Sequence, residues 1–309
     1  MRKALLWLSE RQRIFNFIKR NGLARKFASR FVAGETVDTA IDAVREINRK
    51  NISASLDLLG ESVTQPSDAA AARDEYLRML KRIAETGVNA NVSLKLTQMG
   101  FDIGEAECFG NLKAILDEAK RLNTFVRLDM ESSEYTQRTL DFFYNRLFND
   151  YSAVAGVVIQ SCLRRSEADI NQLIEKRVRV RLCKGAYLEP PDVAFPDKKD
   201  VDRNYVALLE RLLERGNYPG IATHDEAIIK HAREFVKQRN IPADRFEFQM
   251  LYGVRRDLQE QLRQAGFNMR VYIPFGSQWY PYLMRRLAER PANIMFMLGN
   301  IMKESVKRR

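Results

Sequence analysis

The sequence is poor in the residues that build disulfide frameworks and metal centres. Only three of its 309 residues are cysteines, and only two are histidines. Cys108, Cys162 and Cys183 lie far apart and form no CxxC pair, which argues against a disulfide framework or a zinc site. His224 and His231 are too few for a histidine-rich metal centre. We therefore expect no metal, and this cysteine usage is typical of a reducing cytoplasm.

Several longer signatures are also missing. No run of eighteen apolar residues occurs, so we expect no membrane-spanning helix. The basic and briefly apolar stretch at 1–15 lacks the long apolar core and the cleavage site of a secretory signal peptide. No GxSxG element is present to supply an activated serine. No GxGxxG loop occurs either, which disfavours an open dinucleotide-binding sheet.

Negative charge is in the minority, and the excess of positive charge is confined to the two ends. The net charge is +11, of which residues 1–50 carry +7 and residues 285–309 carry +5. Basic ends attract nucleic acid or anionic lipid, although solvated basic helices explain them equally well. No basic ladder interleaved with aromatic residues is present, and we expect no nucleic-acid partner. A non-enzymatic binding protein that uses both ends remains an alternative hypothesis.

Eight β-like runs recur along the chain, and helix-like stretches lie between them. Alternation of strands and helices predicts a parallel sheet, and eight strand–helix pairs predict a closed (β/α)8 barrel of the TIM type. The predicted strands are 53–60, 91–96, 125–130, 156–161, 178–183, 220–224, 246–251 and 270–274. The predicted helices include 67–86, 105–122, 166–176, 202–215, 225–240 and 254–265.

Cap residues mark several of the predicted helix ends. Side chains of Ser and Asp accept hydrogen bonds from the first free amides of a helix, and Gly readily adopts the left-handed conformation that ends one. The expected N-caps are Ser67 or Asp68, Ser166 and Asp225, and the expected C-caps are Gly87 and Gly216. The helix-like residues before the first strand predict an N-terminal helical arm over 1–50, followed by the barrel over 51–309.

In a barrel of this kind the active site lies at the carboxyl ends of the strands. Nearly every predicted strand delivers a polar or charged side chain there. For any one of them, a solvated loop position or a core ion pair is as good an explanation as catalysis. Together they predict a cationic pocket for an anionic ligand such as phosphates, a carboxylate or a flavin. These residues are Asp57, Glu61, Lys95, Asp129, Glu131, Gln160, Arg181, Lys184, Thr223, His224, Gln249 and Tyr272.

Two pairs of cations stand out. Arg181 and Lys184 end a strand that otherwise looks made for burial, and a buried cation is costly unless an anion answers it. Arg285 and Arg286 are adjacent in a predicted helix after the last strand. Such a pair is usually solvated surface. Over the barrel mouth it would form a clamp for a carboxylate, with planar bonds that lysine does not reproduce.

Two chemistries fit these residues. Lys95 and Lys184 both end strands, so Schiff-base chemistry, as in a lysine aldolase or another carboxylate-binding lyase, is open. Hydride transfer to a flavin needs little acid–base machinery, only cations and donors near the flavin and a substrate held against it. The flavin hypothesis fits best, although spacing alone does not identify it.

The motifs resemble those of the flavin-dependent proline dehydrogenases, most closely the short monofunctional bacterial enzymes. The resemblance spans roughly 50–300 and is carried by VSLKLTQMG, RLDMES, VIQSCLRR, VRLCKGAYLEP, IATHDE, FEFQMLYG, VYIPFG and YLMRRLAERPAN. It implies FAD-dependent oxidation of L-proline to Δ1-pyrroline-5-carboxylate, with electrons passed to a membrane quinone.

The resemblance also implies roles for individual residues. Asp129 and Arg181 would be catalytic, Asp129 beside the reacting carbon and Arg181 near flavin N5. Flavin and its phosphates would then be the counter-charges of Arg181 and Lys184, and Gly185 would allow close approach. The implied substrate-binding residues are Lys95, Arg285 and Arg286 at the carboxylate, Tyr187 and Tyr272 around the ring with Leu182 nearby, and Glu61 paired with the first arginine. The implied FAD-binding residues are Met130, Gln160, Arg181, Lys184, Gly185, Ala186, Thr223 and His224.

Partners and location follow from the same resemblance. An unstable product implies a partner pyrroline-5-carboxylate dehydrogenase. A cytoplasmic enzyme with two basic ends would be able to rest on the inner face of the plasma membrane, where its quinone lies.

Overall fold

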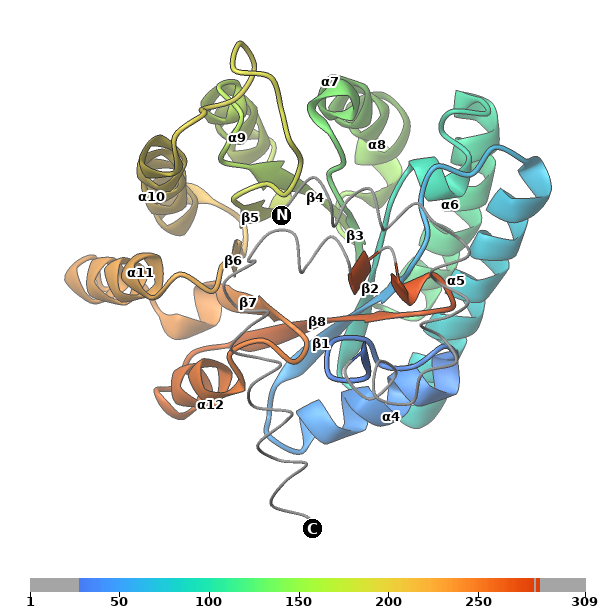
Figure 1. The fold of residues 1–309 in the computed structure, drawn as a ribbon, viewed down its shortest axis with the longest axis horizontal. Helices are drawn as coiled ribbons and strands as arrows, with labels where there is room; N and C mark the ends of the chain where they lie inside the picture. Colours follow the sequence, from blue (N-terminus) through green and yellow to red (C-terminus); the bar gives the residue numbers. More distant parts are fainter. Residues whose placement is uncertain (1–27, 281, 284–309) are drawn as a thin grey trace.

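A computed structural model describes residues 28–280, 282 and 283. Its eight strands are all parallel and close into a barrel in chain order, so the predicted (β/α)8 architecture is confirmed (Figure 1). The strands are β1 (Ser53–Leu58), β2 (Ala90–Leu94), β3 (Val126–Leu128), β4 (Ala155–Gln160), β5 (Arg179–Cys183), β6 (Gly220–Ala222), β7 (Glu247–Leu251) and β8 (Met269–Phe275).

The barrel closes between its first and last strands. β1 pairs with β8 over six residues, from Ser53 opposite Arg270 to Leu58 opposite Phe275. Strands of a closed parallel barrel are covered on both faces, which favours near-continuous apolar runs. β4 is the clearest case, since all six of its residues are buried.

Helices form the outer layer, as Figure 1 shows. They are α4 (Val37–Asn48), α5 (Pro66–Thr86), α6 (Glu105–Arg121), α7 (Ser133–Phe142), α8 (Phe148–Tyr151), α9 (Ser166–Glu175), α10 (Lys198–Arg215), α11 (Glu226–Gln238) and α12 (Arg256–Gln264). Short 3₁₀ turns, η1 (Thr97–Met99) and η3 (Ala243–Arg245), and a π turn, η2 (Phe143–Leu147), complete them. The six helices predicted from the sequence are all present.

Helix α4, within the predicted N-terminal arm, packs on the barrel wall. It contacts both β1 and β8 and so covers the seam where the barrel closes. Val37, Ile41 and Val44 from one face of α4 are buried in the main hydrophobic core. Residues 1–27 of the predicted arm lie outside the described residues.

Two predicted caps are confirmed, two are wrong, and one differs in conformation. Ser67 and Asp68 lie inside α5, whose N-cap is Gln65. Asp225 caps α11 by accepting a hydrogen bond from the Ala227 amide, and Gly87 ends α5 with φ +64°. Ser166 is not an N-cap, because it lies inside α9 and its hydroxyl donates to the Gln160 carbonyl. Gly216 follows α10 with φ −74°, so it ends the helix in an extended conformation.

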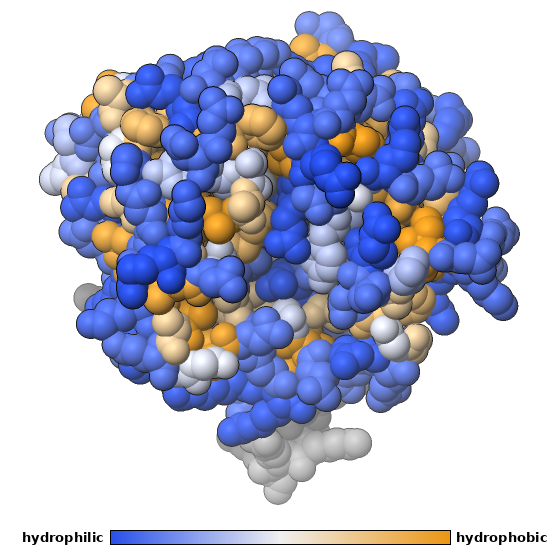
Figure 2. Space-filling model, turned by 180° about the vertical axis from the view of Figure 1, so that it is seen from behind, coloured by the Kyte–Doolittle hydropathy of each residue, from blue (hydrophilic) through white to orange (hydrophobic). Residues whose placement is uncertain are grey.

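The surface of the opposite face is mainly hydrophilic. Figure 2 shows apolar residues scattered there among polar ones. Within the described ranges, no helix is long and apolar enough to cross a membrane.

Candidate active site

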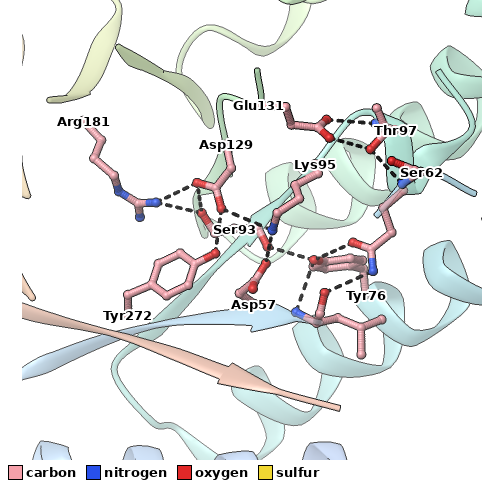
Figure 3. Close-up of polar contacts among 12 residues, drawn as sticks. Asp57, Ser62, Tyr76, Ser93, Lys95, Thr97, Asp129, Glu131, Arg181 and Tyr272 are labelled. Atoms are coloured by element: carbon pink, nitrogen blue, oxygen red, sulfur yellow. Dashed lines mark hydrogen bonds and ion pairs between the residues drawn. The ribbon is translucent and has the colours of Figure 1, made fainter. Parts of the chain in front are cut away.

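Asp129, directly after β3, is the centre of a polar cluster at the carboxyl ends of the strands (Figure 3). Its Oδ1 accepts hydrogen bonds from Arg181 Nη1 at 2.7 Å and from Ser93 Oγ at 2.8 Å. Its Oδ2 accepts from the Tyr272 hydroxyl at 2.7 Å. Because these donors come from β5, β2 and β8, one carboxylate ties together strands from around the barrel.

Arg181 is buried and held by several partners. Its Nε donates to Gln249 Oε1 at 2.6 Å, and its guanidinium lies 5.2 Å from the centre of the Tyr272 ring. Gln249 in turn donates to Glu247, which pairs with Arg270 at 2.6 Å. This chain of hydrogen bonds and ion pairs runs along the barrel interior and fixes the orientation of the Arg181 side chain.

The counter-charges of the two cations in β5 and its loop come from the protein. Arg181 pairs with Asp129, and Lys184 pairs with Asp202 and, at 2.7 Å, with Asp225. Both cations therefore already have carboxylate partners within the chain, and the expectation that flavin and its phosphates balance their charge stays a prediction. The acids were out of reach of sequence reasoning because Asp202 lies on α10 and Asp225 caps α11, each far along the chain from Lys184.

Lys95, directly after β2, is surrounded by carboxylates. Its Nζ lies 3.1 Å from Asp57 Oδ1 and 4.0 Å from Asp129 Oδ2. Burial alone would lower the pKa of Lys95, but the charges of Asp57, Asp129 and Glu61 outweigh burial and raise it. Lys95 is therefore an ammonium ion at neutral pH.

The same surroundings disfavour the charged form of Asp57. Burial raises the pKa of Asp57 to about 6, and the Asp129 charge adds to the rise, although the Lys95 ammonium opposes both. Burial, followed by the charges of Asp129 and Asp57, also holds the pKa of Tyr272 well above its usual value. Tyr272 thus stays a phenol and a hydrogen-bond donor.

The loop after β5 carries four of the predicted residues. Gly185 has φ +101°, and a Cβ there would lie 2.4 Å from Cys162 Sγ, so packing within the chain already requires glycine. Tyr187 is 37% exposed, and Ala186 is also exposed. Glu189 holds the loop to the start of α7 by accepting a hydrogen bond from the Ser133 amide at 2.8 Å.

Gln160, at the end of β4, has a buried atom that lacks a partner. Its Nε2 donates to the Glu131 carbonyl at 3.1 Å and lies 3.5 Å from the Met130 carbonyl. Its Oε1 is buried with no hydrogen-bond partner among the described residues. A buried acceptor left in this way costs about 1–3 kcal/mol, which makes the atom a candidate ligand contact.

Thr223 and His224, the two residues after β6, each accept a hydrogen bond from a backbone amide. Thr223 Oγ1 accepts a hydrogen bond from the Asp225 amide at 3.1 Å. His224 Nε2 accepts one from the Leu251 amide at 2.9 Å, so that this ring nitrogen carries no proton.

The predicted site residues fall into two neighbouring arcs of the barrel mouth. The predicted substrate residues Glu61, Lys95 and Tyr272 belong to β8, β1 and β2 or their loops, which are consecutive in the barrel. The predicted cofactor residues lie on or directly after β3, β4, β5 and β6, and the predicted substrate residue Tyr187 lies among them, in the loop after β5. Asp129 and Arg181 join the arcs. Arg285 and Arg286 lie outside the described residues.

Sequence reasoning missed some members of the cluster. Ser93 donates a hydrogen bond to Asp129. The only feature of the sequence that could have indicated this role is the position of Ser93 on β2, where it alternates with outward-facing neighbours in VSLKL. Glu189 and Thr97 carry no such signal, because their partners become neighbours only when separate loops meet.

Comparison with known proteins agrees with the motifs. The family profile described as Proline dehydrogenase matches residues 40–298. The chain is 40% identical over 304 residues to proline dehydrogenase 1 of Bacillus subtilis subsp. natto, covering 98% of this chain and 100% of the relative. It is 41% identical over 306 residues to the proline dehydrogenase of Deinococcus radiodurans, covering 98% of each.

A solved structure has the same barrel. Proline utilization A (PutA) from Bdellovibrio bacteriovorus, inactivated by N-propargylglycine, superposes with a TM-score of 0.82 at 25% identity. The match covers 93% of this chain but only 34% of that longer one. The bifunctional protein PutA of Escherichia coli is 28% identical over 317 residues, and 24% of its length is covered.

Proposed function

The chain belongs to the proline dehydrogenase family and is an oxidoreductase that acts on proline, and we propose that it oxidises L-proline to Δ1-pyrroline-5-carboxylate with FAD as its cofactor. The match covers 98% of this chain and 98–100% of these relatives, which fits the monofunctional bacterial type. The single observation that carries the detailed proposal is the Lys95–Asp129–Arg181–Tyr272 cluster at the mouth of the barrel.

The proposed substrate chemistry assigns each member of the cluster a task. Oxidation removes a hydride from the ring carbon next to nitrogen and a proton from the nitrogen, which leaves a C=N bond. The Lys95 ammonium, together with Arg285 and Arg286, binds the carboxylate of proline. Tyr272 and Tyr187 enclose the ring. Asp129 fixes the Tyr272 hydroxyl and the Arg181 guanidinium, so that both are in place before substrate arrives.

The described residues fit FAD on the other arc of the mouth. The buried Oε1 of Gln160 is a hydrogen-bond acceptor with no donor among the described residues, and a flavin ring carries an N–H donor. Lys184, Gly185 and Ala186, with Thr223 and His224, would hold the rest of the cofactor, and Met130 would contribute its backbone. FAD held here would supply the hydride acceptor. Arg181 would provide a fixed positive charge for the negative charge that reduction places on the flavin, near N5.

The charge state of Lys95 weighs against a Schiff-base enzyme. An imine-forming lysine needs a neutral amine, and such lysines have a lowered pKa. Three carboxylates instead raise the pKa of Lys95. This favours an electrostatic role over a covalent one.

We also propose a membrane quinone as the electron acceptor and a cytoplasmic location, with the basic ends resting on anionic lipid of the plasma membrane. Among the described residues, the large apolar side chains that are most exposed are Tyr187, Leu188 and Val193, all in the loop after β5. Their position beside the proposed flavin site supports access of the quinone to the flavin from the side of this loop. Because the cyclic imine product hydrolyses, we propose a separate pyrroline-5-carboxylate dehydrogenase as its consumer.

Steady-state kinetics with an artificial electron acceptor test the substrate assignment. Arg285→Met should raise the KM for L-proline at least about tenfold, since one lost charged contact is worth about 1.5–3 kcal/mol, and should leave the flavin bound. Cyclopentanecarboxylate keeps the ring and the carboxylate but lacks the amine. Its inhibition constant should rise in parallel. A variant that loses flavin but keeps its affinity for proline would refute the assignment.

A further inference from the structure

The loop at 59–64, which follows β1 and carries Glu61, is fastened to a neighbouring strand end through Thr97. The Ser62 amide donates to Thr97 Oγ1 at 3.0 Å, and the Val63 amide donates to the Thr97 carbonyl at 3.3 Å. Thr97 is fully buried, at the start of η1. Figure 3 shows the contact between Ser62 and Thr97 beside the Asp129 cluster.

Thr97 is in turn held by Glu131, on the loop after β3. The Thr97 hydroxyl donates to Glu131 Oε2 at 2.6 Å, and the Thr97 amide donates to Oε1 at 3.2 Å. An ionised carboxylate only accepts, so the hydroxyl hydrogen points to Glu131 and the oxygen lone pairs are left for Ser62. Glu131 therefore sets the direction of the bond that holds the loop.

The loop needs such a tie. Ser62 has φ +55°, a left-handed conformation that costs a non-glycine residue about 1–2 kcal/mol. At the base of the loop, Gln98 Nε2 donates to the Leu58 carbonyl at 3.0 Å. The two consecutive residues Thr97 and Gln98 thus hold both ends of the segment around Glu61.

The position of this loop matters because Glu61 acts on Lys95. Glu61 lies in this loop, next to Ser62, and its negative charge is among those that raise the pKa of Lys95 against the lowering effect of burial. Lys95 stands two residues before Thr97 on the same segment. A shift of the 59–64 loop would therefore change the field around the ammonium ion that is proposed to bind substrate.

We propose that Glu131 and Thr97 are positioning residues which fix Glu61 relative to Lys95 and thereby set the affinity for the substrate carboxylate. They act without touching substrate or cofactor. The inference rests on the proposed function only for the identity of that substrate. The fastening of the loop is independent of it.

Two variants of Thr97 separate the effect of its hydroxyl group from the effect of its side-chain shape. Thr97→Val removes the hydroxyl and keeps the volume, whereas Thr97→Ser keeps the hydroxyl. Thr136→Val is the matched control, because Thr136 is equally buried and its hydroxyl has no partner among the described residues. Hydrogen–deuterium exchange of the 59–64 peptide gives a readout that needs no turnover.

Thr97→Val should speed amide exchange in 59–64 and raise the KM for proline about tenfold, with kcat within about threefold and flavin content unchanged. Thr97→Ser and Thr136→Val should match the parent within about twofold in all four measurements. Glu131→Gln should shift exchange and KM in the same direction. The double variant Glu131→Gln with Thr97→Val should be no worse than the worse single one, because both break one chain of bonds.

Unchanged exchange in Thr97→Val would overturn the proposed tie. Faster exchange with an unchanged KM would overturn its link to binding, and an equal rise of KM in Thr136→Val would show a general packing effect instead. If the parent itself fails to oxidise proline, the proposed function fails, while the exchange data still decide whether Thr97 holds the loop.

Discussion

Asp129 has both of its carboxylate oxygens occupied by donors from three other strands. Such a carboxylate is an effective organiser of its neighbours, because both of its oxygens accept hydrogen bonds. Its charge compensates the buried Arg181, and its second oxygen orients the Tyr272 hydroxyl. At the scale of the residue, the site depends on these fixed directions more than on any single contact.

Asp129→Asn should therefore destabilise the protein as well as inactivate it. The amide leaves Arg181 buried without a counter-charge, a loss of about 3–5 kcal/mol by analogy with broken buried ion pairs. We expect kcat/KM for proline to fall about 100-fold or more. Tyr272→Phe removes one neutral donor and should cost only about 1 kcal/mol. Urea unfolding that finds Asp129→Asn as stable as the parent would contradict the assigned ion pair.

Asp57 should make stability depend on pH. Its pKa is raised to about 6 in the folded state, so the native protein binds this proton more tightly than the unfolded chain does. The stabilisation is complete below about pH 4 and is lost as the pH rises through about 6, up to about 3 kcal/mol for a shift of this size. Asp57→Asn lacks this titration and keeps an acceptor for Lys95.

The difference in melting temperature between Asp57→Asn and the parent should therefore move in favour of the variant between pH 4 and pH 7. Melting curves at four or five pH values measure it. A difference that stays constant across this range would show that Asp57 does not titrate there.

At the scale of the element, the loop after β5 is determined by its neighbours. Gly185 has a positive φ and touches Cys162, and the Ser133 amide anchors Glu189. These constraints place the loop before any ligand binds. The loop also provides the proposed contacts of Lys184, Gly185 and Ala186 with FAD, so its shape and cofactor affinity should change together.

Gly185→Ala should lower both the melting temperature and the affinity for FAD. The new methyl group lies 2.4 Å from Cys162 Sγ, and φ +101° is strained for alanine at a cost of about 1–3 kcal/mol. Adding Cys162→Ala removes the clash but not the strain, so the double variant should recover only in part. Flavin fluorescence titration and thermal melts measure the two effects. Full recovery, or no loss in Gly185→Ala, would contradict this account.

The sequence pattern predicts elements well and their connections poorly. All eight strands lie within a few residues of the predicted ranges because apolar runs bounded by turn residues are a local signal. The helical segment over 133–151 has a weaker signal, since its buried positions begin with Thr136 and Thr139 and become apolar only at Leu140. Asp202 and Asp225 as partners of Lys184 depend on how distant loops meet, which no local pattern encodes.

At the scale of the whole molecule, the barrel is one folding unit closed at the seam between β1 and β8. α4 covers that seam, and its buried face belongs to the same hydrophobic core that runs through the strands and the other helices. Closure brings Tyr272 of β8 beside the residues of β1 and β2. The candidate active site therefore forms only when the complete barrel has closed.

Ile41→Ala on α4 should thus destabilise the entire barrel. Ile41 is 1% exposed, and truncation of such a side chain costs about 2–5 kcal/mol. Glu46→Ala, on the exposed face of the same helix, should change stability by about 0.5 kcal/mol or less. Denaturant unfolding followed by both tyrosine fluorescence and circular dichroism should give one shared transition. Separate transitions would show that α4 is not part of the barrel unit.

The most direct test of the proposed function is an absorption spectrum of the purified protein, reconstituted with FAD, before and after anaerobic addition of L-proline. We predict a bound-flavin spectrum that bleaches with L-proline and returns when a quinone is added. A bound flavin that L-proline leaves oxidised, or a protein that takes up no FAD at all, would contradict the assignment of the two arcs of the barrel mouth to substrate and cofactor.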